Sequence, residues 1–117
     1  MYAATKAGVV SLSSSVNAEA PRGTRVHALC PDGADTAMLA AQDPDGMGAQ
    51  LVHSGGPILT VEQVAAAAVA LVGSRRVVRT VPGWRGGVAR GAALAPGVAQ
   101  HVVGLFAAQG RRSMRRR

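Results

Sequence analysis

Tyr2 and Lys6 stand four positions apart near the start of the chain, in the segment YAATK. Residues four apart lie on the same face of a helix, so a phenol and an ammonium at this spacing can reach one site. A nearby ammonium favours the phenolate and lowers the pKa of a tyrosine, as a general acid/base requires. Taken alone the spacing is common, and its ordinary alternative is a partly exposed tyrosine on an amphipathic helix.

A helix over residues 2–20 is predicted to carry this pair, because the segment contains almost no helix breaker before Pro21 and Gly23. Its apolar residues recur at helical spacing, at Val9, Leu12, Val16 and Ala20. The run Arg25–Cys30 that follows is β-branched and aliphatic and is closed by Pro31. It predicts a short buried strand.

Residues 31–59 are rich in Gly, Pro and Asp and predict a loop, with a small helix near Ala37–Gln42. Thr60 and Gln63 then form a T-x-x-Q capping box, with Leu59 and Val64 placed for a hydrophobic staple. The helix that begins there is predicted to run to Val72, with Gly73 as its C-terminal residue.

A second strand is predicted over Val77–Val81, before Pro82-Gly83. The alternation of helices and strands indicates an α/β protein with a parallel sheet. Parallel sheets are buried on both faces and need several strands, so two strands form only part of one.

The ordered set of motifs over residues 2–83 resembles the short-chain dehydrogenase/reductase family. The residues that carry the resemblance are the segment YAATKAGVV at 2–10, then Leu12, Glu19 and Val26, and the turn PDGADT at 31–36. The resemblance implies that residues 1–83 are the C-terminal part of a Rossmann-like, doubly wound parallel sheet. It also implies an NAD(P)-dependent enzyme that interconverts an alcohol and a carbonyl in a small-molecule substrate.

The same resemblance assigns roles to single residues. Tyr2 would donate or accept the substrate proton, and Lys6 would lower the pKa of Tyr2 and bind the nicotinamide ribose. The turn would contact the nicotinamide and pyrophosphate of NAD or NADP through Pro31, Gly33, Ala34 and Thr36. Residues 37–59 would form a substrate lid that includes Met38, Leu39, Met47 and Leu51, for which an ordinary surface loop is an equal alternative.

The sequence departs from the family pattern in two respects. Asp32 stands where the family usually has Gly and places a carboxylate near the expected pyrophosphate, while Gly33 beside it supplies backbone freedom. The sequence also has no G-x-G-x-x-G turn and no partner serine before Tyr2. We therefore expect an incomplete site that is inactive in isolation, and a first helix whose uncovered face favours a homo-oligomer.

The C-terminal residues favour a second hypothesis. Residues 84–87 are predicted to be a flexible link, followed by a helix over Leu94–Gln109 that begins near Pro96. One face of that helix is apolar (Val98, Val102, Leu105 and Phe106), and an arginine-rich tail lies beyond it. Such a helix can lie on an anionic membrane surface or in the groove of a partner, so residues 84–117 could form a non-catalytic interaction module.

Charge and composition exclude other classes. The net charge is +7, but five arginines lie within the last seven residues, and residues 1–110 carry 8 basic and 6 acidic groups. Basic residues spread over a folded face with aromatic platforms are absent, which disfavours specific nucleic-acid binding. The three histidines lack metal-ligand spacing, so no metal site is predicted. A single cysteine, Cys30, predicted to be a small core residue, and the absence of a signal or membrane-spanning segment indicate a cytoplasmic protein.

Overall fold

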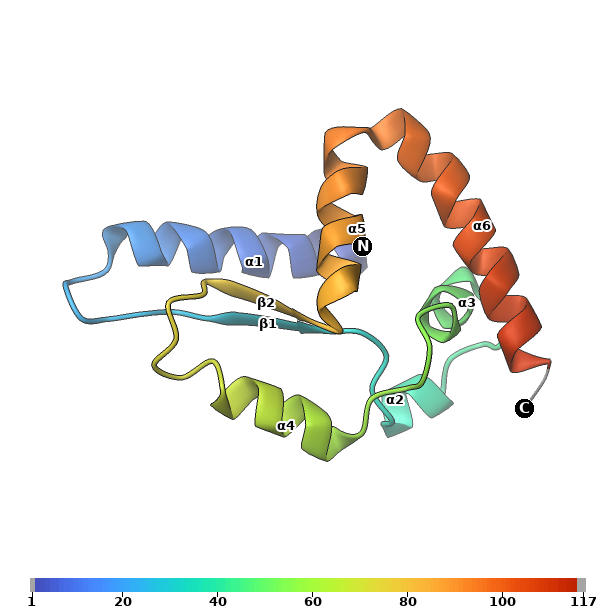
Figure 1. Cartoon of the computed structure of the whole chain (residues 1–117), viewed down its shortest axis with the longest axis horizontal. Coiled ribbons are helices and arrows are strands. Elements are labelled where there is room, and N and C mark those ends of the chain that lie inside the picture. Colours follow the sequence, from blue (N-terminus) through green and yellow to red (C-terminus); the bar gives the residue numbers. More distant parts are fainter. Residues whose placement is uncertain (1, 116–117) are drawn as a thin grey trace.

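The computed structural model describes the backbone of residues 2–115 and the side chains of residues 3–115 (Figure 1). Within them the elements follow in the order α1 (Tyr2–Glu19), β1 (Ala28–Pro31), α2 (Ala37–Ala40), α3 (Met47–His53), α4 (Val61–Val69), β2 (Val78–Val81), α5 (Gly83–Leu94) and α6 (Pro96–Met114). The fold is therefore α/β, mostly helical, with a small sheet.

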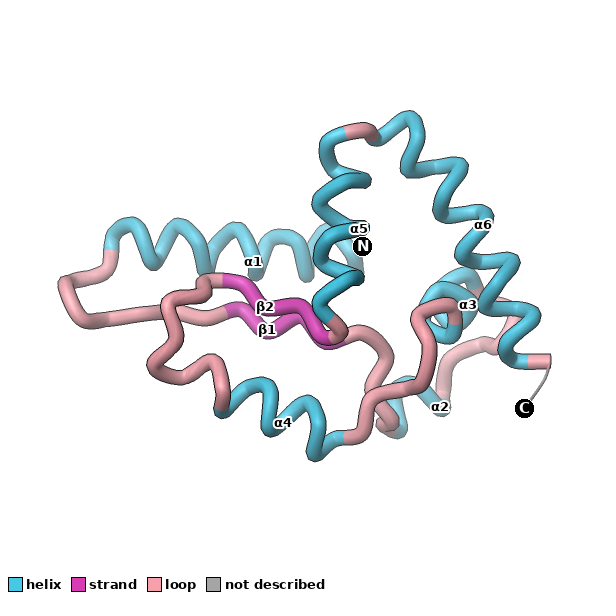
Figure 2. Tube along the Cα trace, in the orientation of Figure 1, coloured by secondary structure: helices cyan, strands magenta, loops and turns pink. Residues whose placement is uncertain are grey.

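The two strands pair in parallel, which confirms the predicted direction of the sheet. Ala28 lies opposite Val78 and Pro31 opposite Val81, and the Asp32 N–H continues the ladder by donating to the Val81 carbonyl at 2.8 Å. The connection between the strands contains α4. Helix α1 lies on one side of the strands and α4 on the other (Figures 1 and 2).

Strand β1 begins three residues later than predicted because a side chain takes the place of a neighbouring strand. The Val26 N–H donates to Asn17 Oδ1 at 3.0 Å, and Asn17 Nδ2 donates to the Val26 carbonyl. This amide bridge ties α1 to the segment before β1. The predicted burial of this strand is only partly confirmed, since Ala28 is buried but Leu29 and Cys30 are half-buried.

The predicted capping box is present at the start of α4. The Gln63 N–H donates to Thr60 Oγ1 at 3.2 Å, and the Thr60 N–H donates to Gln63 Oε1 at 2.9 Å. Hydrogen bonds from its own backbone and from the Thr60 side chain hold the pKa of the exposed Glu62 carboxyl below its usual value. The helix ends at Val69, three residues early, and a turn leads to Gly73, whose φ of +77° suits glycine.

The prediction of a flexible link over residues 84–87 is wrong, because these residues belong to α5. Glycines weaken a helix in isolation, but here one of them serves packing. Gly86 is buried against β2, where a Cβ atom would lie only 2.7 Å from Thr80 Oγ1. Helix α6 does begin at Pro96, but it runs past Gln109, so Arg111 and Arg112 lie within the helix and not beyond it.

The most extensive contact between two helices joins α3 to α6, and α3 was not predicted. Gly110 lies directly against the backbone of Gln50, so closely that a Cβ atom would overlap the Gln50 carbonyl. The buried Gln50 side chain accepts a hydrogen bond from Arg111 Nη1 at 2.7 Å and donates to the Asp45 carbonyl at 2.9 Å. These contacts cross the predicted boundary at residue 83.

The buried apolar core of the described residues is small and consists of alanines and one leucine: Ala28, Ala49, Ala67, Leu71 and Ala107. Helix α1 contributes little to it, since Leu12 is 63% exposed and Val9 52%. The expectation that the first helix presents apolar side chains to solvent is met in this structure.

Candidate functional site

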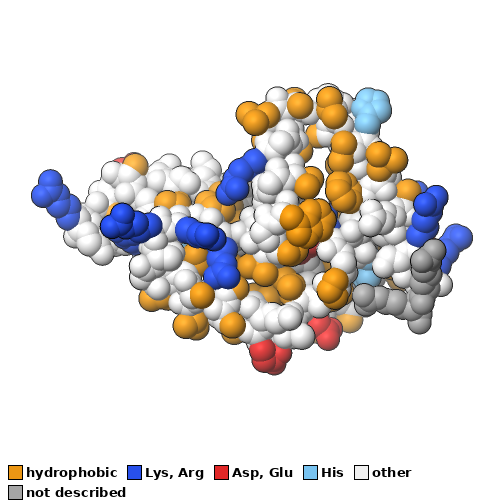
Figure 3. Space-filling view, in the orientation of Figure 1, with side chains coloured by type: hydrophobic (Ala, Val, Ile, Leu, Met, Phe, Trp, Pro, Cys, Tyr) orange, Lys and Arg blue, Asp and Glu red, His pale blue; other side chains and the backbone are white. Residues whose placement is uncertain are grey.

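A cavity of about 580 Å³ opens at the carboxyl ends of the two parallel strands, between α5 and α6. Ligands bind at this end of the strands in open α/β sheets. Cys30 and Pro31 of β1 and Thr80 of β2 form its floor, and the rest of the wall is largely aliphatic, including Val88, Ala92, Val98, Val102 and Val103. Figure 3 shows hydrophobic side chains gathered along the space between the two helices. Size and lining are typical of a pocket for a small apolar molecule.

Arg85 forms the polar end of this cavity. Its Nε donates to Asp32 Oδ2 at 2.8 Å, and its Nη2 donates to the Leu51 carbonyl at 2.7 Å and to Ser54 Oγ at 3.1 Å. The Arg85 and Asp32 side chains are only 16% and 22% exposed, so water screens the pair weakly. One guanidinium therefore joins the turn after β1, helix α3 and helix α5.

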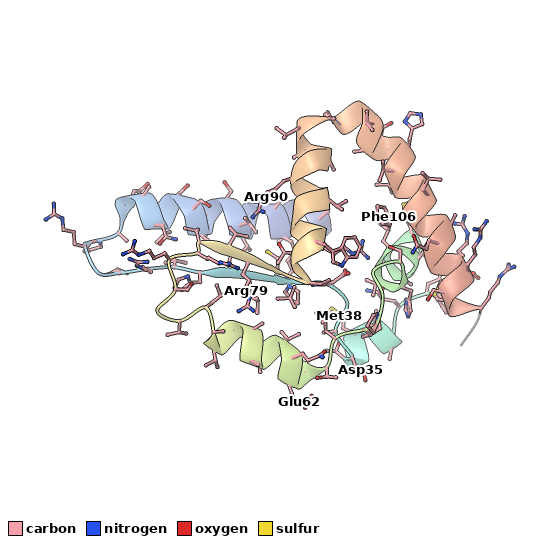
Figure 4. The ribbon with its side chains drawn as sticks, in the orientation of Figure 1. Asp35, Met38, Glu62, Arg79, Arg90 and Phe106 are labelled. Carbon is pink, nitrogen blue, oxygen red and sulfur yellow. The ribbon has the colours of Figure 1, made fainter. Side chains whose placement is uncertain are left out.

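The surroundings of the ion pair are shaped to admit it. A Cβ atom at position 55 would lie 2.4 Å from both Arg85 Nη2 and Asp32 Oδ2, so Gly55 leaves the space that the pair needs. Trp84 and Phe106 stack with ring centroids 6.4 Å apart, and the Arg85 guanidinium carbon lies 5.0 Å and 5.6 Å from the two centroids. Cation–π attraction to these two rings further stabilises the position of the Arg85 guanidinium. Phe106 brings α6 to this cluster (Figure 4).

The predicted proton-transfer pair lies on α1. The backbone positions of Tyr2 and Lys6 are both helical, and positions four apart in a helix share a face. The side chain of Tyr2 lies outside the described residues. Lys6 is exposed and is not among the described residues that line the cavity.

Of the predicted cofactor-binding residues, Pro31 is the last residue of β1, and Gly33, Ala34 and Thr36 follow it before α2. Of these, Pro31 also lines the cavity. The Leu59 N–H donates to the Gly33 carbonyl at 2.9 Å, and the Asp35 N–H donates to the Leu59 carbonyl at 2.9 Å, which fixes the turn.

Two features of this turn bear on what it can bind. Within the described residues the backbone N–H groups of Gly33, Ala34 and Thr36 donate no hydrogen bond. Gly33 does not have a positive φ, so the backbone freedom that we expected it to supply is not used in that way. Its small size is needed instead, because a Cβ atom there would overlap the Val52 side chain and approach Ile58.

The predicted lid divides between two surroundings. Met38 and Met47 are 69% and 61% exposed. Leu51 lines the cavity, and Leu39 lines a separate depression beside Met114. Because α3 packs on α6, the part of this segment nearest the cavity is held in place.

Within the described part of the chain, no group of three or more His, Cys, Asp or Glu side chains is placed to hold a metal ion. None of the helices in that part is both long and apolar enough to cross a lipid bilayer. No protein-family model, curated protein or solved structure matches the chain.

Arg85 is the side chain of the candidate site that the sequence pattern did not identify. It is 53 residues from Asp32 and lay in the segment assigned to a link. The available signal was the pair of unusual residues, an acid where the resemblance expects glycine and an arginine next to the chain's one tryptophan.

Proposed function

We propose that this chain supplies the C-terminal portion of an NAD(P)-dependent oxidoreductase that interconverts an alcohol and a carbonyl. The observation that carries the proposal is the order of elements around the turn. A helix that begins with Y-x-x-x-K precedes β1, the PDGADT turn follows it, and α4 leads to a parallel β2. Helices α1 and α4 lie on opposite sides of the strands, as in a doubly wound sheet (Figure 1).

The turn after β1 fits a nucleotide cofactor. Its three N–H groups that donate no hydrogen bond within the described residues would suit the carboxamide and phosphate oxygens of NAD or NADP. The Asp32 carboxylate, which the sequence places near the expected pyrophosphate, forms an ion pair with Arg85, and this pairing would reduce its repulsion of a phosphate. Pro31, Gly33, Ala34 and Thr36 would hold the cofactor together with Lys6.

Each residue of the proposed pair has one task. Tyr2 donates a proton to the carbonyl oxygen in reduction and accepts it from the hydroxyl in oxidation. The Lys6 ammonium stabilises the phenolate form of Tyr2. The cofactor supplies the hydride chemistry when it is bound.

The apolar cavity supports an apolar substrate. It shares Pro31 with the turn, so a molecule in the cavity would lie beside the proposed nicotinamide position. Its polar groups are few, chiefly Arg85 with Asp32, and Thr80. An alcohol or ketone with an aliphatic body would bury most of its surface there.

A nuclear magnetic resonance titration with the two halves of the cofactor tests this proposal. Nicotinamide mononucleotide should shift the amide signals of Gly33, Ala34 and Thr36 with a dissociation constant on the order of millimolar. Adenosine monophosphate should leave those three signals in place, since the chain has no glycine-rich turn for the adenosine half. Equal shifts with both compounds, or none with either, would contradict the proposal.

The interaction module remains a second candidate because part of its apolar surface is exposed. Leu94, Val98 and Leu105 are 88%, 63% and 72% exposed. However, α6 also packs on α3 through Gly110, so deleting the helix would disturb the fold. Vesicle co-sedimentation of Leu105→Gln tests this candidate better, since loss of membrane binding without loss of helix content would support it.

A further inference from the structure

A concentration of arginines lies at the other end of the sheet, where the strands begin. A depression of about 350 Å³ there is lined by Arg22 and Arg25 from the segment before β1 and by Arg75 and Arg76 from the segment before β2. Half of the eight basic residues in positions 1–110 are therefore gathered in one place by the fold. Figure 3 shows Lys and Arg side chains at this end of the molecule.

The four arginines lack compensating charge. Neither Asp nor Glu is among the described residues that line the depression. The ion pair between Arg85 and Asp32 is the one found among residues 3–115, so none of these four guanidinium groups is paired with a carboxylate there. Like charges held together repel one another, and a bound anion relieves that repulsion.

The two segments are cross-linked, which keeps the arginines together. Arg25 Nη1 donates to the Ser74 carbonyl at 3.1 Å, and His27 Nδ1 lies 2.6 Å from the Arg76 carbonyl. Asn17 holds Val26 from the side of α1. The side chains of Arg22, Arg75 and Arg76 have no hydrogen-bond partner among the described residues and are exposed, so their donors face solvent.

We propose that this basic depression, formed by Arg22, Arg25, Arg75 and Arg76, binds a compact soluble anion that carries two or three phosphoryl groups. Guanidinium groups match phosphate oxygens with paired hydrogen bonds, better than lysine does. No Phe, Tyr or Trp side chain lines the depression to stack a base, and the His27 ring that does line it is held at the Arg76 carbonyl. The small size of the depression offers no track for a long strand. The depression lies at the amino ends of the strands, away from the cavity, so this binding is independent of the proposed oxidoreductase function.

Calorimetric titration of the full chain with inorganic tripolyphosphate tests the proposal. We expect one bound anion per chain and an affinity that falls as salt is raised. The double substitution Arg75→Gln with Arg76→Gln should weaken binding at least about tenfold, because two guanidinium groups that can each form paired hydrogen bonds to phosphate are lost. Replacing the same two residues by lysine should give an intermediate affinity.

The matched control removes the same charge elsewhere. Arg90→Gln with Arg112→Gln changes two exposed arginines on α5 and α6 that do not line the depression (Figure 4 labels Arg90), and it should alter affinity less than about twofold. Equal losses in the two double variants would overturn the proposal, since binding would then follow net charge alone. Absence of tripolyphosphate binding at low salt would also overturn it, as would tighter binding to a single-stranded oligonucleotide or to anionic vesicles.

Discussion

Replacing Arg85 by methionine removes the guanidinium while keeping an unbranched apolar side chain. The substitution breaks three hydrogen bonds, to Asp32, Leu51 and Ser54. A hydrogen bond to a charged group contributes about 1.5–3 kcal/mol, and the Arg85–Asp32 pair is largely shielded from water. Because the Arg85 and Asp32 side chains keep 16% and 22% exposure, water replaces part of the loss. We therefore expect the free energy of unfolding to fall by about 2 kcal/mol.

Urea unfolding followed by far-ultraviolet circular dichroism measures this change. Fluorescence of Trp84, the only tryptophan, serves as a second probe of the same transition. The matched control is Arg90→Met on the same helix, where the side chain is exposed and makes no contact with the ion pair. Its free energy of unfolding should change by no more than about 0.5 kcal/mol. Equal stabilities of the two variants would refute the assignment of Arg85 as the residue that joins the turn, α3 and α5.

A double-mutant cycle isolates the charge pair within that cluster. Asp32→Asn keeps an oxygen that can accept from Arg85 but removes the negative charge. The two substitutions should then be coupled by about 1 kcal/mol. Additive effects would show that the ion pair contributes nothing beyond its hydrogen bonds.

Four further substitutions test the packing and the surface of the fold. Gly110→Ala places a methyl group against the Gln50 carbonyl and should lower the free energy of unfolding by about 1–3 kcal/mol. Gly104→Ala lies on the same helix with open space around it, so it should raise the free energy of unfolding by up to about 1 kcal/mol in the same denaturation experiment. Shifts of the same sign would contradict the close α3–α6 contact. Thr60→Ala removes the cap of α4 and should cost about 1 kcal/mol in thermal unfolding, and no change would argue against the capping box. Leu12→Glu should abolish the concentration-dependent association that we expect in sedimentation, and a wild-type chain that is monomeric throughout would contradict association through α1.

Local signals in the sequence predicted the elements whose residues interact with near neighbours. The Thr60–Gln63 capping box is contained within a few residues and was recognised, whereas the helix it starts ends at Val69, before the predicted end at Gly73. The parallel pairing of the strands followed from the alternation of helix and strand.

The missed features depend on contacts between distant residues. The glycines of α5 argue against a helix until Gly86 is seen to need its small size beside Thr80. Helix α3 lies in a segment rich in helix breakers, and its partner Gly110 is 60 residues from Gln50. Arg85 and Asp32 are likewise brought together only by the turn after β1 and the start of α5. Arg22 and Arg25 are likewise far in sequence from Arg75 and Arg76, and the fold brings the four side chains to one depression.

Spectrophotometric titration of the phenol tests most directly the proposed interaction between Tyr2 and Lys6, because Tyr2 is the only tyrosine in the chain. At low salt the pKa of Tyr2 should lie below the ordinary tyrosine value of about 10. Substituting Lys6→Met should raise the measured pKa by at least about half a unit, since the ammonium that favours phenolate is gone. A Tyr2 pKa that stays the same in the two proteins would contradict the account, because the lysine would then have no influence on the proposed proton donor.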